Sequence, residues 1–544
     1  MKPKKNAKIS HQDTEKIECG NCGKMVDSVG KDQTEVFGFP HSPVTAKNTR
    51  RKVRATLDKE LFCLPLGKGK FLVYAPLRRA AFVANAAAVN SMAALKEGRC
   101  VSGKAATEFV EFLRRLEIAD APEAKPPLSV FTEKTTPLSV TLFLTTACNL
   151  RCAYCYACAG EGKAQFMSPT LAKRAIDFVV ANARERGEKH FEINFHGGGE
   201  PTQNWRTLTE AVSYAQKLAK EHGLEFTAYT ATNGVFSDKQ LDWIIANLSG
   251  ASVSLDGLPE VHDANRVTTA GQGSSAAVLH TLRRFEEEKF SYGIRMTVTA
   301  EMIKRLPDSV DFICANFHPS QLQAEPAFQI GRWVDAPPAE TAAFVAAFRK
   351  AAARGRKYGA ELTFSGARTG TLSNHFCAAT QDLFAVTPDG DVSSCYEIFD
   401  DKNPRSNIFI YGKENKGGGW LFDSKKTAFL RAQSVDNRPY CKGCFARWSC
   451  GGDCLQKILS IYGEKEFAGS GRCAIIRELT KDQILEKIAA AGGVFWHELP
   501  GDLHFQRTDA AAVGNCDCVS CGENAAEPII SFETISQSTT GEHT

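Results

Sequence analysis

The sequence predicts an α/β protein built from a series of β/α units, with a small α+β module before them and a cysteine-rich domain after them. Three observations predict this order. Short apolar runs alternate with amphipathic segments from about residue 138, which is the pattern of parallel strands connected by helices. Short strand-like and helical patterns precede this region, and seven of the 19 cysteines lie between residues 377 and 473.

The α+β module is expected at residues 56–125. Residues 61–85 predict two or three short strands with a Gly-Lys-Gly turn, because glycine marks turns between apolar runs. Helical patterns follow at residues 86–98 and 106–118. A small winged-helix-like module fits this order.

Six β/α units are expected at residues 138–365. The first helix is expected to begin after Ser168, which suits the N-cap position, with Pro169 in the first turn. Further helical patterns lie at residues 237–248 and 276–288. The six strands are expected at residues 138–146, 191–197, 224–233, 251–257, 294–300 and 322–328.

Composition and charge exclude several classes of protein. The 544 residues are 43% hydrophobic and 24% charged, a balance typical of a folded protein of two or three domains. The net charge of +4 is too small to indicate a nucleic-acid partner. No stretch is apolar and long enough to span a membrane, and the N-terminus has no apolar signal core. We therefore expect a cytoplasmic protein whose thiols are reduced and bind metal.

Three cysteines directly follow the first predicted strand, in the sequence TTACNLRCAYCYA. Cys148, Cys152 and Cys155 are spaced as C-x3-C-x2-C, so three thiolates from one short loop can converge on an iron–sulfur cluster and leave a fourth iron without a protein ligand. Zinc sites usually gather cysteines in C-x2-C pairs with a closed fourth position, which this spacing fits poorly.

This loop resembles the signature of radical S-adenosylmethionine (SAM) enzymes. In that family the amine and carboxylate of SAM chelate the open iron of a 4Fe-4S cluster, and one electron splits the sulfonium to give a 5′-deoxyadenosyl radical. The resemblance implies a partial (β/α)6 barrel similar to a TIM barrel, with the site at the carboxyl ends of the strands. It also implies an electron donor such as flavodoxin or ferredoxin.

The loops after the other strands extend the resemblance. GGGEPT, at residues 197–202, is similar to the family's GGE motif, which holds the SAM amino group. His196 and His262 are expected to pack or to form hydrogen bonds, and Cys158 is expected to be a bystander. The SAM contacts that the resemblance implies are Gly198, Gly199 and Glu200 for the amino group, Asn233 and Ser254 for the ribose, Arg266 for the carboxylate, and Tyr154 beside the adenine.

The cysteines after residue 370 resemble a second known pattern. Residues 377–395 and CKGCFARWSCGGDC at residues 441–454 are similar to the seven-cysteine SPASM domain of peptide-modifying radical SAM enzymes, expected here at residues 370–490. That domain holds auxiliary 4Fe-4S clusters, so two are implied in addition to the SAM-binding one. The resemblance assigns Cys441, Cys444, Cys450 and Cys473 to one auxiliary cluster, and Cys377, Cys395 and Cys454 to the other.

The second auxiliary set has only three cysteines. Its remaining iron is therefore expected to be open to a substrate group, such as the thiolate of a peptide cysteine, or to be held by another side chain.

The resemblance implies a radical SAM enzyme that modifies a ribosomally made peptide or a protein side chain, by forming a thioether, a carbon–carbon crosslink or another oxidised product. The module at residues 56–125 weakly resembles the element by which such maturases bind a leader peptide on a sheet edge. No catalytic acid or base is assigned.

Two alternatives stay open. An anaerobic sulfatase maturase, which forms formylglycine, has an Asp base where Tyr396 follows Cys395 here. Tyr396 or Glu397 could take a proton role or simply pack. A non-catalytic iron–sulfur redox or metal-sensing protein would need no SAM contacts.

The two ends of the chain carry further cysteines. Residues 1–55 are expected to be a basic, flexible segment with Cys19 and Cys22 as a C-x2-C pair. Residues 491–544 form a tail with Cys516, Cys518 and Cys521, and its composition is typical of disorder. These cysteines could complete a zinc site or act as free thiols.

Overall fold

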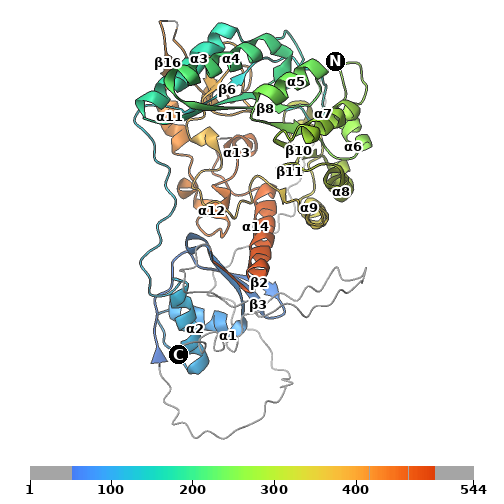
Figure 1. Cartoon of the computed structure of the whole chain (residues 1–544). Coiled ribbons are helices and arrows are strands. Elements are labelled where there is room, and N and C mark those ends of the chain that lie inside the picture. Colours follow the sequence, from blue (N-terminus) through green and yellow to red (C-terminus); the bar gives the residue numbers. More distant parts are fainter. Residues whose placement is uncertain (1–51, 416, 464, 497–544) are drawn as a thin grey trace, which may run out of the picture. The chain divides into compact units, whose positions relative to one another are not determined.

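The computed structural model describes residues 52–496, apart from residues 416 and 464. It divides into two compact units, residues 1–124 with 488–544, and residues 125–487. Each unit is described by itself, and Figure 1 labels their elements. The cysteine pairs and triplets predicted near both ends lie outside the described residues.

The smaller unit is an α+β module with one antiparallel sheet. The sheet has the order β17-β4-β3-β2, so β2 is an edge strand. The rings of Phe82 and Phe112 meet edge-on at 5.1 Å between centroids and lie at the centre of the buried core. The predicted strands and both predicted helices are present, whereas the winged-helix comparison stays a prediction. The elements are β1 (Lys52–Val53), β2 (Phe62–Gly67), β3 (Lys70–Ala75), β4 (Ala80–Asn85), α1 (Ala86–Lys96), β5 (Val101–Ser102), α2 (Lys104–Arg115) and β17 (Val494–Trp496).

The larger unit contains the predicted β/α series. Its first six strands are parallel neighbours in chain order, so the prediction of a partial barrel-like sheet of β/α units is confirmed. The inner residues of the strands, such as Val140 and Ile193, have no exposed surface, as expected for a parallel sheet covered on its faces. The strands are β6 (Ser139–Phe143), β7 (His190–His196), β8 (Glu225–Thr232), β9 (Gly250–Ser254), β10 (Tyr292–Val298) and β11 (Gln321–Pro326).

The helices between these strands begin at the signals that the sequence contains. Ser168 caps α3, because its hydroxyl accepts a hydrogen bond from the Leu171 amide at 3.2 Å. Ser237 and Gln240 form a capping box at the start of α5. Figure 1 shows α3, α4 and α5 along one face of the sheet, and α12 and α13 on the opposite side. The connecting helices are α3 (Pro169–Glu185), α4 (Trp205–His222), α5 (Asp238–Asn247), α6 (Pro259–Asn265), α7 (Ser275–Glu287), α8 (Leu306–Asn316) and α9 (Thr341–Arg356).

The sheet extends at both edges beyond the six predicted strands. β12 (Leu362–Thr363) follows β11, and β13 (Ala385–Val386) pairs in parallel with β6. Three antiparallel strands then continue the sheet on the β13 side, so the cysteine-rich region and the β/α series share one sheet of eleven strands. The remaining elements are β14 (Asp391–Ser393), β15 (Ile410–Glu414), β16 (Trp420–Phe422), α10 (Ser406–Phe409), α11 (Ser424–Arg431), α12 (Arg447–Cys450), α13 (Leu455–Tyr462) and α14 (Gly471–Ala490).

A buried ion network connects the β/α series to the cysteine-rich region. Arg472, at the start of α14, donates to Asp453 at 3.0 Å and to Glu325 on β11 at 3.1 Å. All three side chains are at most 7% exposed. Burial alone would raise the pKa of Glu325, but the charges of Arg472, Lys457 and Arg295 lower it to about 2. Both carboxylates therefore depend on the Arg472 guanidinium.

None of the helices in the described part of the chain is long and apolar enough to cross a membrane.

Replacing Arg472 should strongly destabilise the larger unit. Arg472→Met leaves two buried carboxylates without their cation, which costs about 3–5 kcal/mol. Thermal unfolding followed by circular dichroism measures the change. The matched control is Arg356→Met, which removes a solvent-exposed ion pair with Glu486 and should cost about 0–1 kcal/mol. Equal effects of the two substitutions would contradict this account of the network.

The same network predicts the acid dependence of stability. Because the pKa of Glu325 falls from 4.5 to about 2 on folding, its contribution is present above pH 4.5 and is lost as the pH falls toward 2. This part of the acid dependence should be smaller in Arg472→Met, in which only Lys457 and Arg295 remain to lower the pKa of Glu325.

Candidate functional site

The loop after β6 brings its three cysteines together. The pKa of Cys148 is raised to about 12, mainly by burial, with contributions from the charges of Glu200, Cys152 and Cys155. Burial likewise raises the pKa of Cys152, whereas the Arg266 guanidinium lowers it. The three thiols are therefore close enough to affect one another's pKa. Bound metal would remove their protons.

The cysteine loop supplies the ligand type that an iron–sulfur cluster needs. Cys148, Cys152 and Cys155 are three thiol ligands from one short loop. Among the described residues, no three side chains of His, Cys, Asp and Glu form a ready site for a single metal ion.

Two arginines hold the backbone of this loop. Arg151 donates to the carbonyl oxygens of Cys148 at 2.9 Å and of Gly160 at 2.9 Å. Arg332 donates to those of Cys152 at 3.0 Å and Ala159 at 2.7 Å. Buried carbonyl groups outside regular structure need such donors, so the arginines fix the loop in the form that gathers the thiols.

The glycine loop at residues 197–202 packs directly against the backbone that leads into Cys148. The amide of Gly199 donates to Thr145 at 2.9 Å, and that of Glu200 donates to Ala147 at 2.9 Å. A Cβ atom on Gly199 would lie 2.1 Å from the Ala147 carbonyl oxygen, so only glycine fits there. The glycines of the motif therefore join the ends of β6 and β7.

Glu200 ties the glycine loop to the end of β8. One carboxylate oxygen accepts hydrogen bonds from the hydroxyls of Thr202 at 3.0 Å and Thr232 at 2.9 Å, and the other accepts from the Asn233 amide at 2.8 Å. Burial raises its pKa, although these hydrogen bonds oppose the shift. The Asn233 side chain in turn reaches Asn149 at 2.7 Å, beside Cys148. Glu200 thus has a structural role, and its contact with the SAM amine stays a prediction.

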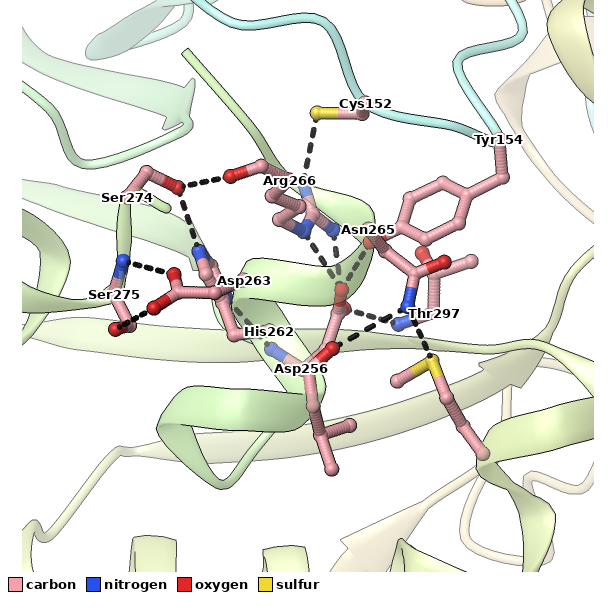
Figure 2. Close-up of polar contacts among 12 residues, drawn as sticks. Cys152, Tyr154, Asp256, His262, Asp263, Asn265, Arg266, Ser274, Ser275 and Thr297 are labelled. Atoms are coloured by element: carbon pink, nitrogen blue, oxygen red, sulfur yellow. Dashed lines mark hydrogen bonds and ion pairs between the residues drawn. The ribbon is translucent and has the colours of Figure 1, made fainter. Parts of the chain in front are cut away.

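Asp256 is the centre of a buried polar group beside Cys152, shown in Figure 2. It accepts from Arg266 Nε at 2.9 Å and Nη2 at 3.2 Å, from the Thr297 amide at 2.9 Å, and from the Tyr154 hydroxyl. Arg266 Nη1 points to Cys152 Sγ, 4.0 Å away. Asp256 thereby orients both Arg266 and Tyr154 next to the cysteine loop, and their contacts with SAM stay predictions.

The two histidines near the site act as packing and hydrogen-bonding groups. Burial lowers the pKa of His262 to about 4. Its Nδ1 accepts from the Asp256 amide, and its Nε2 donates to Ser274, whose hydroxyl donates to the Arg266 carbonyl. Burial also lowers the pKa of His196 to about 4, and its ring stacks on Tyr396 at 4.5 Å. Both histidines are neutral at pH 7.

The later cysteines influence one another in two sets, and their assignment to two clusters stays a prediction from the resemblance. Burial raises the pKa of Cys395 well above its usual range, and the charges of Glu397, Cys454 and Cys377 raise it further. Burial raises the pKa of Cys441 to about 12, with smaller effects of Cys444 and Cys473. Burial raises the pKa of Cys450 well above its usual range, and the charges of Asp453, Cys473 and Cys444 contribute to the shift. Arg368 donates to the carbonyl oxygens of Phe376 and Cys450, at 2.8 and 2.9 Å, and so connects the two groups.

Known proteins share the part of the chain that contains this site. Residues 142–313 match the family described as the radical SAM superfamily. This segment is a radical SAM domain. The family uses a 4Fe-4S cluster and SAM, and the three thiols and the loops around them are of the kind that such a cluster needs.

Relatives extend beyond this domain to different degrees. An Fe-coproporphyrin III synthase of Methanosarcina barkeri is 29% identical over 173 residues, which cover 31% of this chain and 39% of that protein. The mycofactocin maturase MftC of Mycobacterium ulcerans is 28% identical over 338 residues, which cover 59% of this chain and 83% of that protein. The solved structure of native anSMEcpe with bound AdoMet has a TM-score of 0.53 and 18% identity, and covers 65% of this chain and 99% of that one. At this identity the last likeness shows the fold alone.

Sequence reasoning missed three residues of the site. Asp256 follows β9 in the sequence VSLDG at residues 253–257, and its signal was a carboxylate directly after a predicted strand. Arg151 lies between Cys148 and Cys152, and the interpretation of this segment considered only the spacing of the cysteines. Arg332 comes from a loop about 180 residues after the cysteines, and nothing in its local sequence predicts this contact.

Replacing Arg332 should loosen the cysteine loop. Arg332→Met removes two hydrogen bonds to the loop carbonyls, so the cluster should be lost about tenfold faster. Iron transfer to a chelator after anaerobic reconstitution measures this loss. Arg206→Met is the control, because Arg206 is 82% exposed and, in the described part of the chain, forms its ion pair with Glu210. Equal rates in both variants would show that the loop holds its form without Arg332.

Proposed function

We propose that this chain is a radical SAM enzyme that reductively cleaves SAM and oxidatively modifies a ribosomally made peptide or a protein side chain. One observation carries the proposal: Cys148, Cys152 and Cys155, the 197–202 loop and the Asp256–Arg266 pair meet where parallel neighbouring strands end. In β/α folds ligands bind at this edge of the sheet.

The residues at this edge fit the cluster and SAM. Cys148, Cys152 and Cys155 would hold three irons, and the fourth would be left for SAM. Together the cluster and SAM supply a 5′-deoxyadenosyl radical, which abstracts a hydrogen atom. Among the groups held by Asp256, Arg266 carries the positive charge that a SAM carboxylate requires.

The SAM contacts from the other loops complete this proposal. Gly198, Gly199 and Glu200 would meet the amine, and Asn233 and Ser254 would meet the ribose. Tyr154, whose ring lies 5.1 Å from the Arg266 guanidinium, would stack on the adenine.

A polar cavity inside the barrel-like sheet offers space for the modified side chain. Its volume is about 340 Å³, and its lining includes Asn194, His196, Arg295, Gln323 and Tyr396. This volume is at the low end of the range for small-ligand sites, so it suits one or two side chains of a longer substrate. Burial lowers the pKa of His196, and the charge of Arg295 lowers it further. The same charge would favour a substrate that places a carboxylate near Arg295.

Two features favour a peptide substrate. MftC, which matches 59% of this chain, is named a maturase. The smaller unit has β2 at the edge of its described sheet, and an edge strand can bind an extended peptide as an added strand. A leader peptide would bind there. Thioether and carbon–carbon crosslinks both fit this substrate class.

We propose that the cysteine-rich region is a SPASM domain with two auxiliary clusters. Cys441, Cys444, Cys450 and Cys473 would hold one, and Cys377, Cys395 and Cys454 would hold the other. Such clusters would accept the electron released when the substrate radical is oxidised.

The formylglycine alternative is less well supported. The Asp base expected next to Cys395 is replaced by Tyr396, whose hydroxyl lies 3.3 Å from Thr141 and whose ring stacks on His196. Burial raises the Tyr396 pKa, so it is a poor base at neutral pH.

Removing one cysteine of the first group should abolish SAM cleavage. After anaerobic reconstitution and addition of dithionite, Cys148→Ala should form no 5′-deoxyadenosine but should keep iron at the later cysteines. Cys314→Ala is the control, because Cys314 is buried in α8 away from the three groups. Unchanged SAM cleavage in Cys148→Ala would refute the proposed site. If the unmodified chain binds clusters but does not cleave SAM, even with candidate peptides present, a redox or metal-sensing protein is favoured.

Removing the acceptor that orients Arg266 should weaken SAM binding. Asp256→Asn leaves Arg266 and Tyr154 without a shared anion, so the affinity for SAM should fall about 10- to 100-fold. Equilibrium binding of SAM to the reconstituted protein measures this. Asp242→Asn, which removes only an exposed partner of Arg284, should leave the affinity unchanged. If the affinity for SAM is unaltered in Asp256→Asn, this polar group does not contribute to SAM binding.

A further inference from the structure

Arg295 lies on the inner face of the barrel-like sheet, in the middle of β10. It is in register with Ser254 of β9 on one side and with Gln323 of β11 on the other. Its neighbours along the strand, Ile294 and Met296, are at most 2% exposed, and successive side chains of a strand point to opposite faces. Arg295 itself is exposed and lines the polar cavity of about 340 Å³. Its side chain therefore faces the inside of the sheet.

The charge of Arg295 is not balanced by another side chain. None of the described residues that line the cavity is acidic. The nearest carboxylates on the inner face have other partners, because Glu325 pairs with Arg472 and Glu192 accepts from the Asn194 amide group at 2.6 Å. Within the described residues the Arg295 guanidinium takes part in no ion pair. The cavity therefore contains one free cation and no anion.

His196 adds a neutral hydrogen-bond donor to the lining of this cavity. The Gly197 amide donates to its Nδ1 at 2.9 Å, so the proton of the neutral imidazole is on Nε2. The ring of Tyr396, which also lines the cavity, stacks on the imidazole at 4.5 Å between centroids and so limits its orientation. A fixed cation together with an N–H donor is the combination that binds a carboxylate.

The position of Arg295 along β10 relates the cavity to the proposed SAM site. The Arg295 carbonyl accepts from the Leu255 amide at 3.2 Å. Two residues further along the strand, the Thr297 amide donates to Asp256 at 2.9 Å. Two residues of a strand span about 7 Å, and they point to the same face. A group bound by Arg295 would therefore lie one side-chain position from the residues proposed to hold SAM.

We propose that Arg295 is a substrate-binding residue that recognises a carboxylate, so that the substrate carries an acidic group at or beside the position that is modified. The inference rests on the proposed function, because it takes this cavity as the place of the modified side chain. A guanidinium binds a carboxylate through two parallel hydrogen bonds, which fix the direction of the acidic group as well as its position. The group belongs either to an acidic side chain or to the carboxyl terminus of a peptide.

The test measures the binding of capped amino acids to the reconstituted full chain by saturation-transfer NMR under anaerobic conditions. N-acetylglutamate amide is compared with N-acetylglutamine amide, its uncharged counterpart, to test a side-chain carboxylate. N-acetylalanine is compared with N-acetylalanine amide to test a terminal carboxylate. At least one carboxylate probe should bind about tenfold more tightly than its amide counterpart, because a hydrogen bond between two charged groups is stronger than one to a neutral group.

Substitutions assign this preference to Arg295. Arg295→Gln removes the charge but keeps a polar side chain, so the preference for the carboxylate should disappear. Arg295→Lys keeps the charge but loses the planar pair of donors, so it should retain only part of the preference. Arg283→Gln is the control, because Arg283 is exposed on α7 and does not line the cavity. It should keep the whole preference.

Chemical modification provides a second readout that needs no substitution. Phenylglyoxal reacts with accessible guanidinium groups, and mass spectrometry of the digested chain measures the reaction at each arginine. The carboxylate probe that binds should slow the modification of Arg295 several-fold, whereas its amide counterpart should not. The modification of Arg283 should be the same with and without the probes.

Clear outcomes would overturn the inference. Equal affinities of both carboxylate probes and their amide counterparts, or a preference that survives in Arg295→Gln, would show that Arg295 does not bind a carboxylate. A preference for N-acetylalanine alone would assign the group to the carboxyl terminus of the peptide, and one for N-acetylglutamate amide alone to an acidic side chain. If Arg295→Gln does not fold, judged by circular dichroism, Arg295→Lys and the protection from phenylglyoxal decide.

Failure of the proposed function is distinguishable from failure of this inference. None of these measurements depends on SAM cleavage, so a chain that forms no 5′-deoxyadenosine can still bind a carboxylate at Arg295. Conversely, a chain that cleaves SAM but binds the carboxylate and amide probes equally would contradict this inference alone.

Discussion

The rest of the structure depends on the hydrogen bonds that the backbone carbonyl groups of the cysteine loops receive. A cluster needs thiolates from short irregular segments, and such segments cannot pair their carbonyl groups in a helix or a sheet. In this chain arginines provide the donors: Arg151 and Arg332 for the loop of Cys148, and Arg368 for the backbone around Cys377 and Cys450. Each guanidinium carries several donors in a fixed plane, so one side chain can fix several turns of loop.

These arginines also bring positive charge to places where negative charge gathers. Thiolates and the carboxylates of Asp256, Asp453 and Glu397 are concentrated in the interior of the larger unit, where charge is costly. Arg266 contacts the buried carboxylate of Asp256 beside Cys152. Arg472 contacts the buried carboxylate of Asp453, the residue before Cys454. The same arginines therefore fix the loops and balance the buried negative charge, and a neutral replacement would disturb both.

The sequence predicted the repeating parts of the fold well. Periodic apolar runs such as Val140 and Leu142 report burial directly, and local caps such as Ser168 mark helix starts. The spacing of Cys148, Cys152 and Cys155 in one short loop indicated that these three thiols can converge, whereas the grouping of the later cysteines came only from the resemblance to a known family. Interactions between distant segments were less accessible. Arg332 and Arg472 look like ordinary surface arginines in sequence, and only the folded chain shows that each ends on carbonyl or carboxylate oxygens far along the chain.

The sheet itself was underestimated for a related reason. Strands β12 and β13 have two residues each, too few to show a period, yet β13 pairs with β6 and so joins the segment between Cys377 and Cys395 to the strand that leads to Cys148. Tyr156 spans this junction. Its hydroxyl donates to the Gly197 carbonyl at 2.6 Å, and after burial its pKa is raised by Cys155, Glu397 and Cys395 in turn. Tyr156 is therefore close to the group of Cys148, Cys152 and Cys155 and also to the group of Cys377, Cys395 and Cys454. The short pairing of β13 with β6 connects the cysteine-rich region to the first strand of the β/α series and so helps to bring these two groups together.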